Sequence, residues 1–108
     1  MDPPRLSHLE LLILSGLVEQ ERYGLEIIDA VSELSSGSKK LSLGSLYTTL
    51  HRMEAKSLVK SRWGESAGPR RGARRRYYAA TVTGQRAFRE ARSVLSRALS
   101  LAPVGPRS

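Results

Sequence analysis

Cysteine is absent from the 108-residue sequence, and histidine occurs only twice, as His8 and His51. The lack of cysteine excludes disulfides and thiolate-bound metals, and two histidines so far apart do not form the clustered ligand set of a zinc site. No stretch approaches the roughly 20 consecutive apolar residues that a membrane-spanning helix needs. We therefore expect a soluble protein with no cofactor and no membrane partner.

Motifs of the common catalytic sites are missing as well. The sequence has no glycine-rich phosphate loop, no nucleophile elbow and no titratable residues at a catalytic spacing. Residues 1–5 lack the basic segment, apolar run and cleavage site of a secretory signal, and we interpret them as a flexible leader. These absences predict a cytoplasmic protein that is not an enzyme.

Negative charge is scarce outside the first third of the chain. Residues 1–36 carry two basic and seven acidic side chains, a net charge of −5, whereas the remainder carries +13 and the whole chain +8. This asymmetry predicts a polyanionic partner that binds one side of the molecule. Charge alone does not distinguish DNA from RNA or from an acidic membrane surface.

The first helix is predicted over residues 8–20, because Ser7 and Glu10 form a Ser-x-x-Glu capping box at its start. Its apolar residues form two nearly opposite groups, Leu9, Leu12, Ile13 and Leu17 on one side and Leu11, Leu14 and Val18 on the other. A small domain covers one such face with its own core. The second face predicts either contact with a second copy of the chain or burial under its last helix.

Two further helices are separated by a turn. Residues 25–35 resume the helical period with an acidic outer face, residues 35–38 end it, and Ser42 is placed to cap a helix over residues 43–56. The core stripe of this third helix is predicted to contain Leu43, Leu46, Leu50, Met53 and the ring of Tyr47. Its outer face contains Ser45, Thr48, Thr49, Arg52 and Lys56. Short donor-rich side chains without an acid allow this face to approach a DNA groove.

A β-hairpin with a basic tip is predicted after the third helix. Residues 58–63 and 75–80 are strand candidates, the first with Val59, Ser61 and Trp63 on its inner face. Residues 64–74, rich in glycine and arginine, form the tip. The arginines of this segment and the adjoining strand are Arg70, Arg71, Arg74, Arg75 and Arg76. They would neutralise DNA phosphates, although a solvated, mobile loop is the simpler alternative.

The last helix starts after Thr81, which is placed as its cap. Its apolar stripe contains Ala87, Phe88, Ala91, Val94, Leu95, Ala98 and Leu99. Helix, helix, turn, helix and hairpin is the order of a winged helix-turn-helix, a mainly α fold with a small β-hairpin (α+β). We expect such a domain over residues 6–82, a dimerisation helix over 83–100 and a flexible tail over 101–108.

Residues 43–54, Trp63 and residues 76–84 resemble the PadR family of transcriptional regulators. The matching features are the Gly-Ser-Leu-Tyr opening of the third helix, the Leu-x-Arg-Met-Glu after it and the Arg-x-Tyr-Tyr run. The resemblance spans roughly residues 6 to 100. It implies a dimeric winged-helix regulator, usually a repressor, from the branch with a single C-terminal dimerisation helix.

From position and resemblance together, double-stranded DNA is expected to contact Lys39, Lys40, Ser42, Ser45, Tyr47, Thr48, Thr49, Arg52, Arg70, Arg71, Arg74, Arg75 and Arg76. The homodimer interface is expected to contain Leu11, Leu14, Val18, Phe88, Ala91, Leu95, Ala98 and Leu99. Two recognition helices about 34 Å apart would then match an inverted-repeat operator.

Three positions depart from the family pattern. Thr48 replaces a proline common in relatives, and Ala80 replaces a larger aliphatic residue. Ser57 stands where a glycine usually ends the recognition helix. Because a non-glycine residue in a left-handed cap costs about 1 kcal/mol, this helix is expected either to be strained or to end differently.

The only tryptophan is in a predicted strand. Multidrug-binding relatives sandwich ligands with a tryptophan on the last helix, so a drug pocket of that kind is not expected, and a small-molecule effector stays open. Two other functions also stay open. An arginine cluster suits the A-form backbone of RNA, although single-strand readers add aromatic stacking platforms. A winged helix also serves as a protein-interaction adaptor, which would not bind DNA in a salt-dependent manner.

Overall fold

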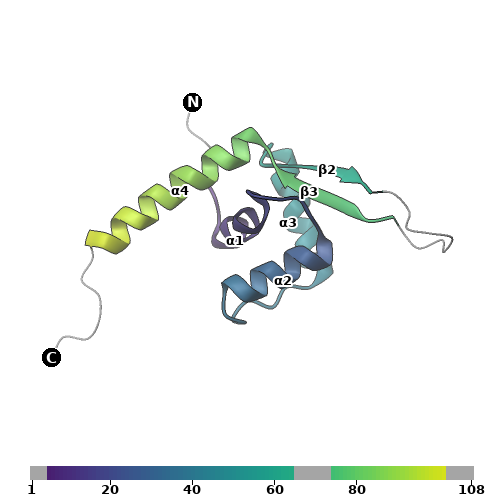
Figure 1. Ribbon diagram of the computed structural model, residues 1–108, viewed down its shortest axis with the longest axis horizontal. Coiled ribbons are helices and arrows are strands. Elements are labelled where there is room, and N and C mark those ends of the chain that lie inside the picture. The colour runs from purple at the N-terminus through teal and green to yellow at the C-terminus, as the bar shows by residue number, and fades with distance from the viewer. Residues whose placement is uncertain (1–4, 65–73, 102–108) are drawn as a thin grey trace.

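The computed structural model describes residues 5–64 and 74–101 (Figure 1). Its elements are α1 (His8–Leu17), β1 (Arg22–Tyr23), α2 (Gly24–Leu34), α3 (Leu43–Ala55), β2 (Val59–Trp63), β3 (Arg76–Ala80) and α4 (Val82–Leu101). This order confirms the predicted α+β winged helix-turn-helix. The predicted leader, hairpin tip and tail lie largely outside the described residues, and so do Arg70 and Arg71.

The helices begin where side-chain caps satisfy their first amides. In α1 the Glu10 amide donates to Ser7 Oγ at 3.1 Å, and the Ser7 amide donates to Glu10 Oε1 at 2.9 Å, which confirms the capping box. Ser42 Oγ accepts from the Ser45 amide at the start of α3. Thr81 Oγ1 accepts from the Gly84 amide at the start of α4. All three predicted caps are therefore present, while α1 ends at Leu17, three residues earlier than expected.

The end of α3 adopts a left-handed cap at Ser57, which was one of the two endings that the sequence allowed. Ser57 has φ +61°, its amide donates to the Glu54 carbonyl at 2.9 Å, and the Leu58 amide donates to the Met53 carbonyl at 2.8 Å. These two bonds form a Schellman motif, which satisfies carbonyls that the helix itself leaves unpaired. The helix thus ends as it would with glycine, and Ser57 carries the cost of about 1 kcal/mol.

The sheet has three antiparallel strands in the order β1-β3-β2. The hairpin strands pair from Val59 with Ala80 to Trp63 with Arg76. On the other edge of β3, Arg22 pairs with Tyr78 and Tyr23 with Tyr77. The sequence did not predict β1, because two residues are too short to show a period of two. Through β1 the start of α2 is attached directly to the hairpin.

The core fills the space between the first three helices, the base of the hairpin and the start of α4. It contains Ile13, Leu14, Leu17, Ile27, Val31, Leu46, Leu50, Met53, Leu58, Val59, Tyr78, Ala80 and Ala87. Two sequence interpretations are corrected. Leu43 was predicted to lie in the core stripe of the third helix, but its side chain is 44% exposed and does not belong to the core. Leu14 is fully buried beside Gly84 of α4, so it is unavailable to a partner and does not belong to the predicted dimer interface.

A buried carboxylate joins α1 to the end of α3. Glu10 is 5% exposed, and its Oε2 lies 2.6 Å from Lys56 Nζ. Burial acts to raise the pKa of Glu10, but the hydrogen bonds and charge of Lys56, together with the bonds to Ser7, leave that pKa below its ordinary value of 4.5. The ionised form is therefore favoured by folding.

Replacing Glu10 with glutamine separates this ion pair from the capping role, because glutamine also completes a capping box. At neutral pH we expect Glu10→Gln to lower the free energy of unfolding by about 1 kcal/mol, since Lys56 is partly exposed and its pair is screened. A carboxylate with a lowered folded-state pKa stabilises above its ordinary pKa and loses that effect as pH falls through the folded value. Urea unfolding should therefore show the difference from the parent protein vanishing well below pH 4.5.

The matched control is Glu26→Gln, because Glu26 accepts the Tyr23 amide in the same way at the start of α2. Its free energy of unfolding should stay close to that of the parent protein across the same pH range. An equal cost of the two substitutions at every pH would show that the Glu10–Lys56 pair contributes nothing.

Candidate nucleic-acid interface

The outer face of α3 presents short hydrogen-bonding side chains. Ser45, Thr48 and Arg52 are all exposed, and Thr48 Oγ1 donates to the Gly44 carbonyl at 3.0 Å. Thr48 Oγ1 can still accept hydrogen bonds, and Arg52 is exposed at the surface of the helix. This face therefore has the donors and acceptors that read base edges in a major groove.

Thr49 was assigned to the same face, and that assignment is wrong. Its side chain is buried, with 4% exposed, and its Oγ1 donates to the Ser45 carbonyl at 2.9 Å. Thr49 precedes the core residue Leu50, and the packing of α3 turns this edge of the helix inwards. It is therefore removed from the set of candidate DNA contacts.

Tyr47 lies at the border between core and surface, as the sequence predicted. Its side chain is 41% exposed, and its ring centroid lies 6.4 Å from that of Tyr78. Its hydroxyl lies beside Gly24, where an added Cβ would be only 2.5 Å from the oxygen. The ring thus packs α3 against the sheet and the first turn of α2, with one edge open to solvent.

Three lysine and serine positions before and at the start of α3 were also predicted. Lys39, Lys40 and Ser42 are all exposed in the turn that leads into the helix. The Lys39 amide donates to Ser35 Oγ at 3.0 Å, which fixes the backbone at this turn. Both lysines precede α3 in the chain, and contact between them and DNA stays a prediction.

The described base of the hairpin carries three of the five predicted arginines. The Gly64 amide donates to the Arg75 carbonyl at 2.6 Å, and Arg74 Nε donates to the Gly64 carbonyl at 3.2 Å. Arg74 and Arg75 are exposed. These bonds close the strand pair and leave two guanidinium groups at the surface, next to the last hairpin pair.

Arg76 is held more tightly than its neighbours. Its Nε and Nη2 donate to Ser61 Oγ at 3.0 and 2.8 Å, and Nη2 lies 3.7 Å from Glu54 Oε1. Ser61 Oγ in turn donates to Glu54 Oε2 at 2.9 Å. Arg76 therefore joins the hairpin to the last turn of α3, and less of its donor capacity is available to a phosphate than in Arg74 or Arg75.

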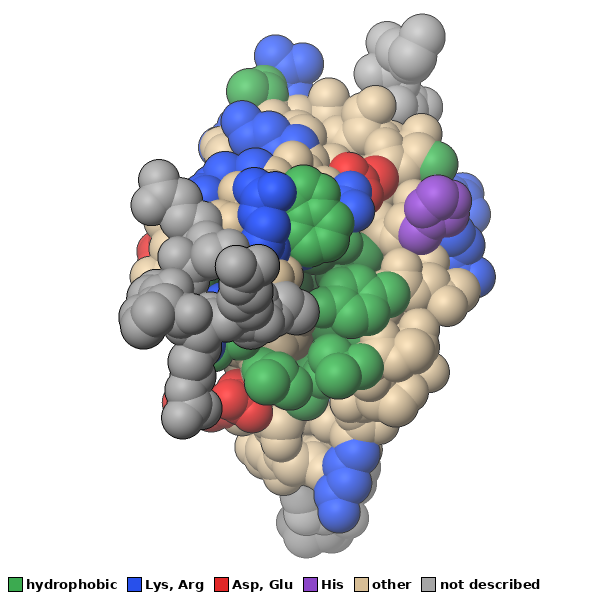
Figure 2. Space-filling model, turned by 90° about the vertical axis from the view of Figure 1, so that its right-hand side faces the viewer, with side chains coloured by type: hydrophobic (Ala, Val, Ile, Leu, Met, Phe, Trp, Pro, Cys, Tyr) green, Lys and Arg blue, Asp and Glu red, His purple; other side chains and the backbone are tan. Residues whose placement is uncertain are grey.

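These elements surround one groove of about 970 Å³ between α3, the start of α2 and the hairpin base. Its lining contains Tyr23, Gly24, Leu25, Leu43, Tyr47, His51, Glu54, Trp63, Arg74, Arg75, Arg76 and Tyr78. Figure 2 looks onto this end of the molecule and shows hydrophobic side chains gathered in the centre, with Lys and Arg side chains nearby. The groove brings the hairpin arginines next to Tyr47 of α3, whereas Ser45, Thr48 and Arg52 lie outside its lining.

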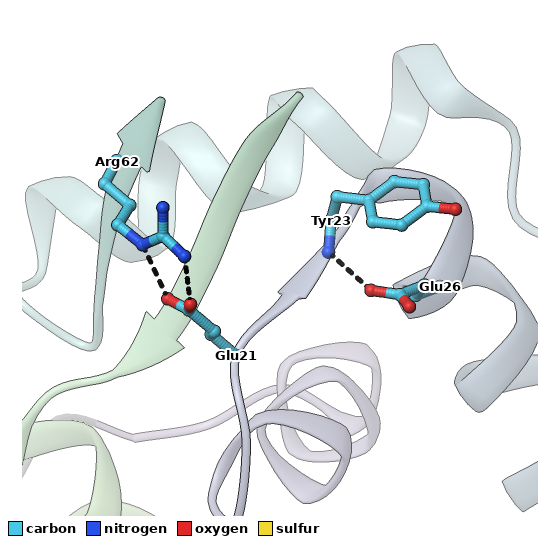
Figure 3. A network of polar contacts seen from close by, with 4 residues as sticks. All are labelled: Glu21, Tyr23, Glu26 and Arg62. Carbon is cyan, nitrogen blue, oxygen red and sulfur yellow. Dashed lines mark hydrogen bonds and ion pairs between the residues drawn. The ribbon is translucent and has the colours of Figure 1, made fainter. Parts of the chain in front are cut away.

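Polar contacts hold the hairpin and the start of α2 in place (Figure 3). Arg62 Nε donates to Glu21 Oε2 at 3.0 Å, and a second bond joins Arg62 Nη2 to Glu21 Oε1. The bond from Arg62 lowers the pKa of Glu21 more than burial raises it. The Tyr23 amide donates to Glu26 Oε1 at 3.1 Å. Because Glu21 precedes β1 and Arg62 lies on β2, this pair spans the central strand β3.

A family model supports the assignment of this architecture. The model of the transcriptional regulator PadR-like family matches residues 13–90, which is most of the chain. The chain belongs to the PadR-like family of transcriptional regulators. An uncharacterised protein of Lysinibacillus sphaericus is 31% identical over 78 residues, which cover 72% of this chain and 69% of that protein.

Solved structures of PadR-like regulators have the same fold. A PadR family regulator from Clostridium difficile is 28% identical, with a TM-score of 0.66 over 87% of this chain and 96% of that one. A transcriptional regulator from Clostridium thermocellum has a TM-score of 0.71 at 24% identity, over 87% and 85% of the two chains. Bacillus subtilis PadR, solved in complex with operator DNA, has a TM-score of 0.68 at 16% identity, over 94% of this chain and 52% of that one.

The last helix of this PadR-like chain extends away from the domain (Figure 1). Phe88 and Ala91 are half-buried, as are Leu11 and Val18 of the first helical region. A second groove, of about 620 Å³, separates the start of α1 from α4 and is lined in part by Leu11, Ala91 and Leu95. Beyond it, Leu95, Ala98 and Leu99 are exposed, Leu99 by 69%. The described chain leaves this apolar stripe without a partner of its own.

Sequence reasoning assigned Tyr47 to the binding surface but missed the other two tyrosines that line the first groove. Tyr23 comes from the two-residue strand β1, and Tyr78 from the buried face of β3. Burial raises the pKa of Tyr78, against a smaller opposing effect of Arg76. The alternation of arginine and tyrosine around residue 76 was a usable signal, but the position of Tyr23 depends on a strand pairing across 54 residues.

No helix in the described ranges is both long and apolar enough to cross a membrane. Within the same ranges, no three histidine, aspartate or glutamate side chains come together as metal ligands would.

Proposed function

We propose that this PadR-like regulator binds double-stranded operator DNA as a homodimer and represses transcription. The observation that carries the proposal is that α3 borders, through Tyr47 and His51, the groove that the hairpin arginines line. The exposed outer face of α3, which can read bases, and the phosphate-binding arginines are therefore neighbouring surfaces. The complex of Bacillus subtilis PadR with operator DNA supports it, since that protein shares the fold.

The outer face of α3 and the hairpin arginines have different roles in the proposal. The exposed Ser45, Thr48 and Arg52 enter the major groove and contact base edges. Arg74 and Arg75 contact the phosphates beside it and provide affinity that does not depend on sequence. Arg70 and Arg71 are assigned the same role from the sequence alone.

The homodimer is proposed to form through α4. Its exposed stripe of Leu95, Ala98 and Leu99 continues the half-buried Phe88 and Ala91, and packs against the equivalent stripe and the α1 region of a second copy. Leu11 and Val18 complete this surface. Two-fold symmetry then presents two copies of α3 to two half-sites about 34 Å apart. Such a dimer bound over a promoter blocks access of the polymerase.

Replacing Arg74 and Arg75 together with alanine tests the phosphate contacts. Loss of two charged hydrogen bonds of about 1 kcal/mol each should weaken binding about 30-fold, for specific and non-specific duplexes alike. Each lost phosphate contact should also reduce the slope of log affinity against log salt by about 0.9. Fluorescence anisotropy with labelled duplexes over a series of salt concentrations measures both quantities.

The matched control is Arg89→Ala with Arg97→Ala, which removes the same charge from exposed positions of α4. These variants should retain the salt dependence of the parent protein. An equal reduction in both pairs would assign the effect to net charge alone and remove the hairpin from the proposed interface.

Sequence specificity is tested by footprinting on the DNA upstream of the protein's own gene. We expect a protected inverted repeat, and we expect Thr48→Ala and Arg52→Ala to change the preferred sequence while leaving binding to unrelated duplexes intact. Binding to duplex RNA with equal affinity would favour an RNA-binding module instead. No salt-dependent binding to either nucleic acid would favour an adaptor.

A further inference from the structure

Contacts between guanidinium groups and aromatic rings are concentrated at the hairpin base. Arg74 and Arg76 lie 5.9 and 5.2 Å from the ring centroid of Trp63, and Arg75 lies 4.5 Å from that of Tyr23. Two more contacts join Arg62 to Tyr77 and Arg76 to Tyr78. Significant contacts of this kind occur about once per 70–80 residues in proteins. In the described part of the chain, all five of these contacts lie around one hairpin.

Trp63 is at the centre of this group and on the side of the hairpin that faces α3. It pairs directly with Arg76 across the strands, and it shares one face of β2 with Ser61 and the buried Val59. Trp63 is nevertheless 53% exposed and lines the groove. A large ring that stays half exposed to water contributes little to the core. Its position is better explained by the arginine side chains that lie over it.

A guanidinium group over a ring covers its flat face and keeps its N–H edge available for hydrogen bonds. Arg74 uses Nε for the Gly64 carbonyl, and Arg76 uses two nitrogens for Ser61. Their stacking on Trp63 restricts long side chains that otherwise occupy many rotamers. Because ordering such a side chain on binding reduces affinity, an arginine that is already ordered binds a phosphate more tightly.

We propose that Trp63 is a positioning residue that holds Arg74 and Arg76 in place at the hairpin base, so that Arg74 is already ordered when it binds a DNA phosphate. This rests on the proposed DNA-binding function and adds a residue that the sequence assigned only to the inner face of a strand. Trp63 acts through the two arginines and adds no charge of its own. Its loss should therefore lower affinity without changing the number of counterions released.

Trp63→Leu and Trp63→Phe are the test variants, since phenylalanine keeps a ring for stacking. Measured by anisotropy on the same duplex, Trp63→Leu should bind about tenfold more weakly, with the salt slope of the parent protein. Trp63→Phe should stay within about threefold of the parent. Leu34→Ala, which truncates an equally exposed side chain at the far end of α2, should bind as the parent does.

A double-mutant cycle separates positioning from direct contact with DNA. In an Arg74→Ala, Arg76→Ala background, Trp63→Leu should cause no further loss of affinity, because the groups it positions are gone. A further tenfold loss in that background would overturn the proposal and indicate that Trp63 itself contacts DNA. Thermal unfolding of each variant identifies any loss of binding caused by unfolding, and Trp63→Phe then provides the comparison in a folded chain.

Failure of this inference is distinguishable from failure of the proposed function. If Trp63→Leu binds like the parent while the Arg74, Arg75 double variant is weakened, the positioning role is wrong and DNA binding stands. If the parent protein itself shows no salt-dependent duplex binding, both are wrong.

Because Trp63 is the only tryptophan of the chain, its fluorescence reports directly on DNA binding at the hairpin base. Its emission should change on adding duplex to the parent and not to the double arginine variant Arg74→Ala, Arg76→Ala.

Discussion

Replacing Gly84 with alanine is expected to lower the free energy of unfolding by about 3 kcal/mol, the upper range of overpacking substitutions. A Cβ at this position would lie 2.0 Å from the Leu58 carbonyl oxygen and 3.0 Å from its carbon. Both atoms belong to the backbone, so no side chain can rotate away. Relief requires α4 to move from the α3–β2 junction, which also strains the Thr81 cap that donates to the Ser57 carbonyl. Thermal unfolding at fixed protein concentration should show a midpoint lower by at least about 10 °C.

Gly44→Ala is the matched control, because an added Cβ there meets nothing within 4 Å. Gly44 lies in α3, where alanine is favoured over glycine by up to about 1 kcal/mol, so a small gain in stability is expected. If the two substitutions had the same effect, the close approach of α4 to Leu58 would not constrain the fold.

Phe88→Glu combined with Leu95→Glu is expected to produce monomers in sedimentation velocity. Each carboxylate would have to be buried without a partner between two apolar stripes, which is strongly unfavourable. A monomer engages one half-site, and loss of the linked second site should lower operator affinity by about 100-fold or more. Binding to a single half-site should change little, because α3 and the hairpin are untouched.

The control adds the same two charges elsewhere on α4. Ser93 and Ser96 are exposed and lie off the apolar stripe of the helix. Ser93→Glu with Ser96→Glu should leave dimers intact and operator affinity near that of the parent. Dimers that persist in the Phe88, Leu95 variant would show that the subunits associate through a different surface.

Features that depend on neighbouring residues were predictable from the sequence. The caps at Ser7, Ser42 and Thr81 each join groups three residues apart, so spacing alone identified them. The hairpin strands followed from alternation of side chains and from the polar segment between them. The candidate DNA face followed from charge, because 16 of the 18 lysine and arginine residues follow residue 36.

Burial at the edges of a helix was less predictable. Thr49 and Leu43 sit near the boundary between the two faces of α3, where a helical wheel gives no clear answer. The packing of α3 against α2 and the sheet makes Thr49 buried and Leu43 exposed. The sequence also left Leu14 with two alternatives, a partner or the last helix, and the position of α4 decides for the helix.

By itself, then, the sequence determined the family, the order of the four helices and the hairpin, the caps at Ser7, Ser42 and Thr81, and which part of the chain is basic. Only the tertiary structure decided that Tyr23 reaches the hairpin through β1, that Leu14 is internal, and that two arginine side chains lie over the ring of Trp63 at the groove. The physical reason is the separation along the sequence of the residues that are in contact. Caps and periodic faces arise from contacts within a few residues, whereas these features depend on how separate elements pack together.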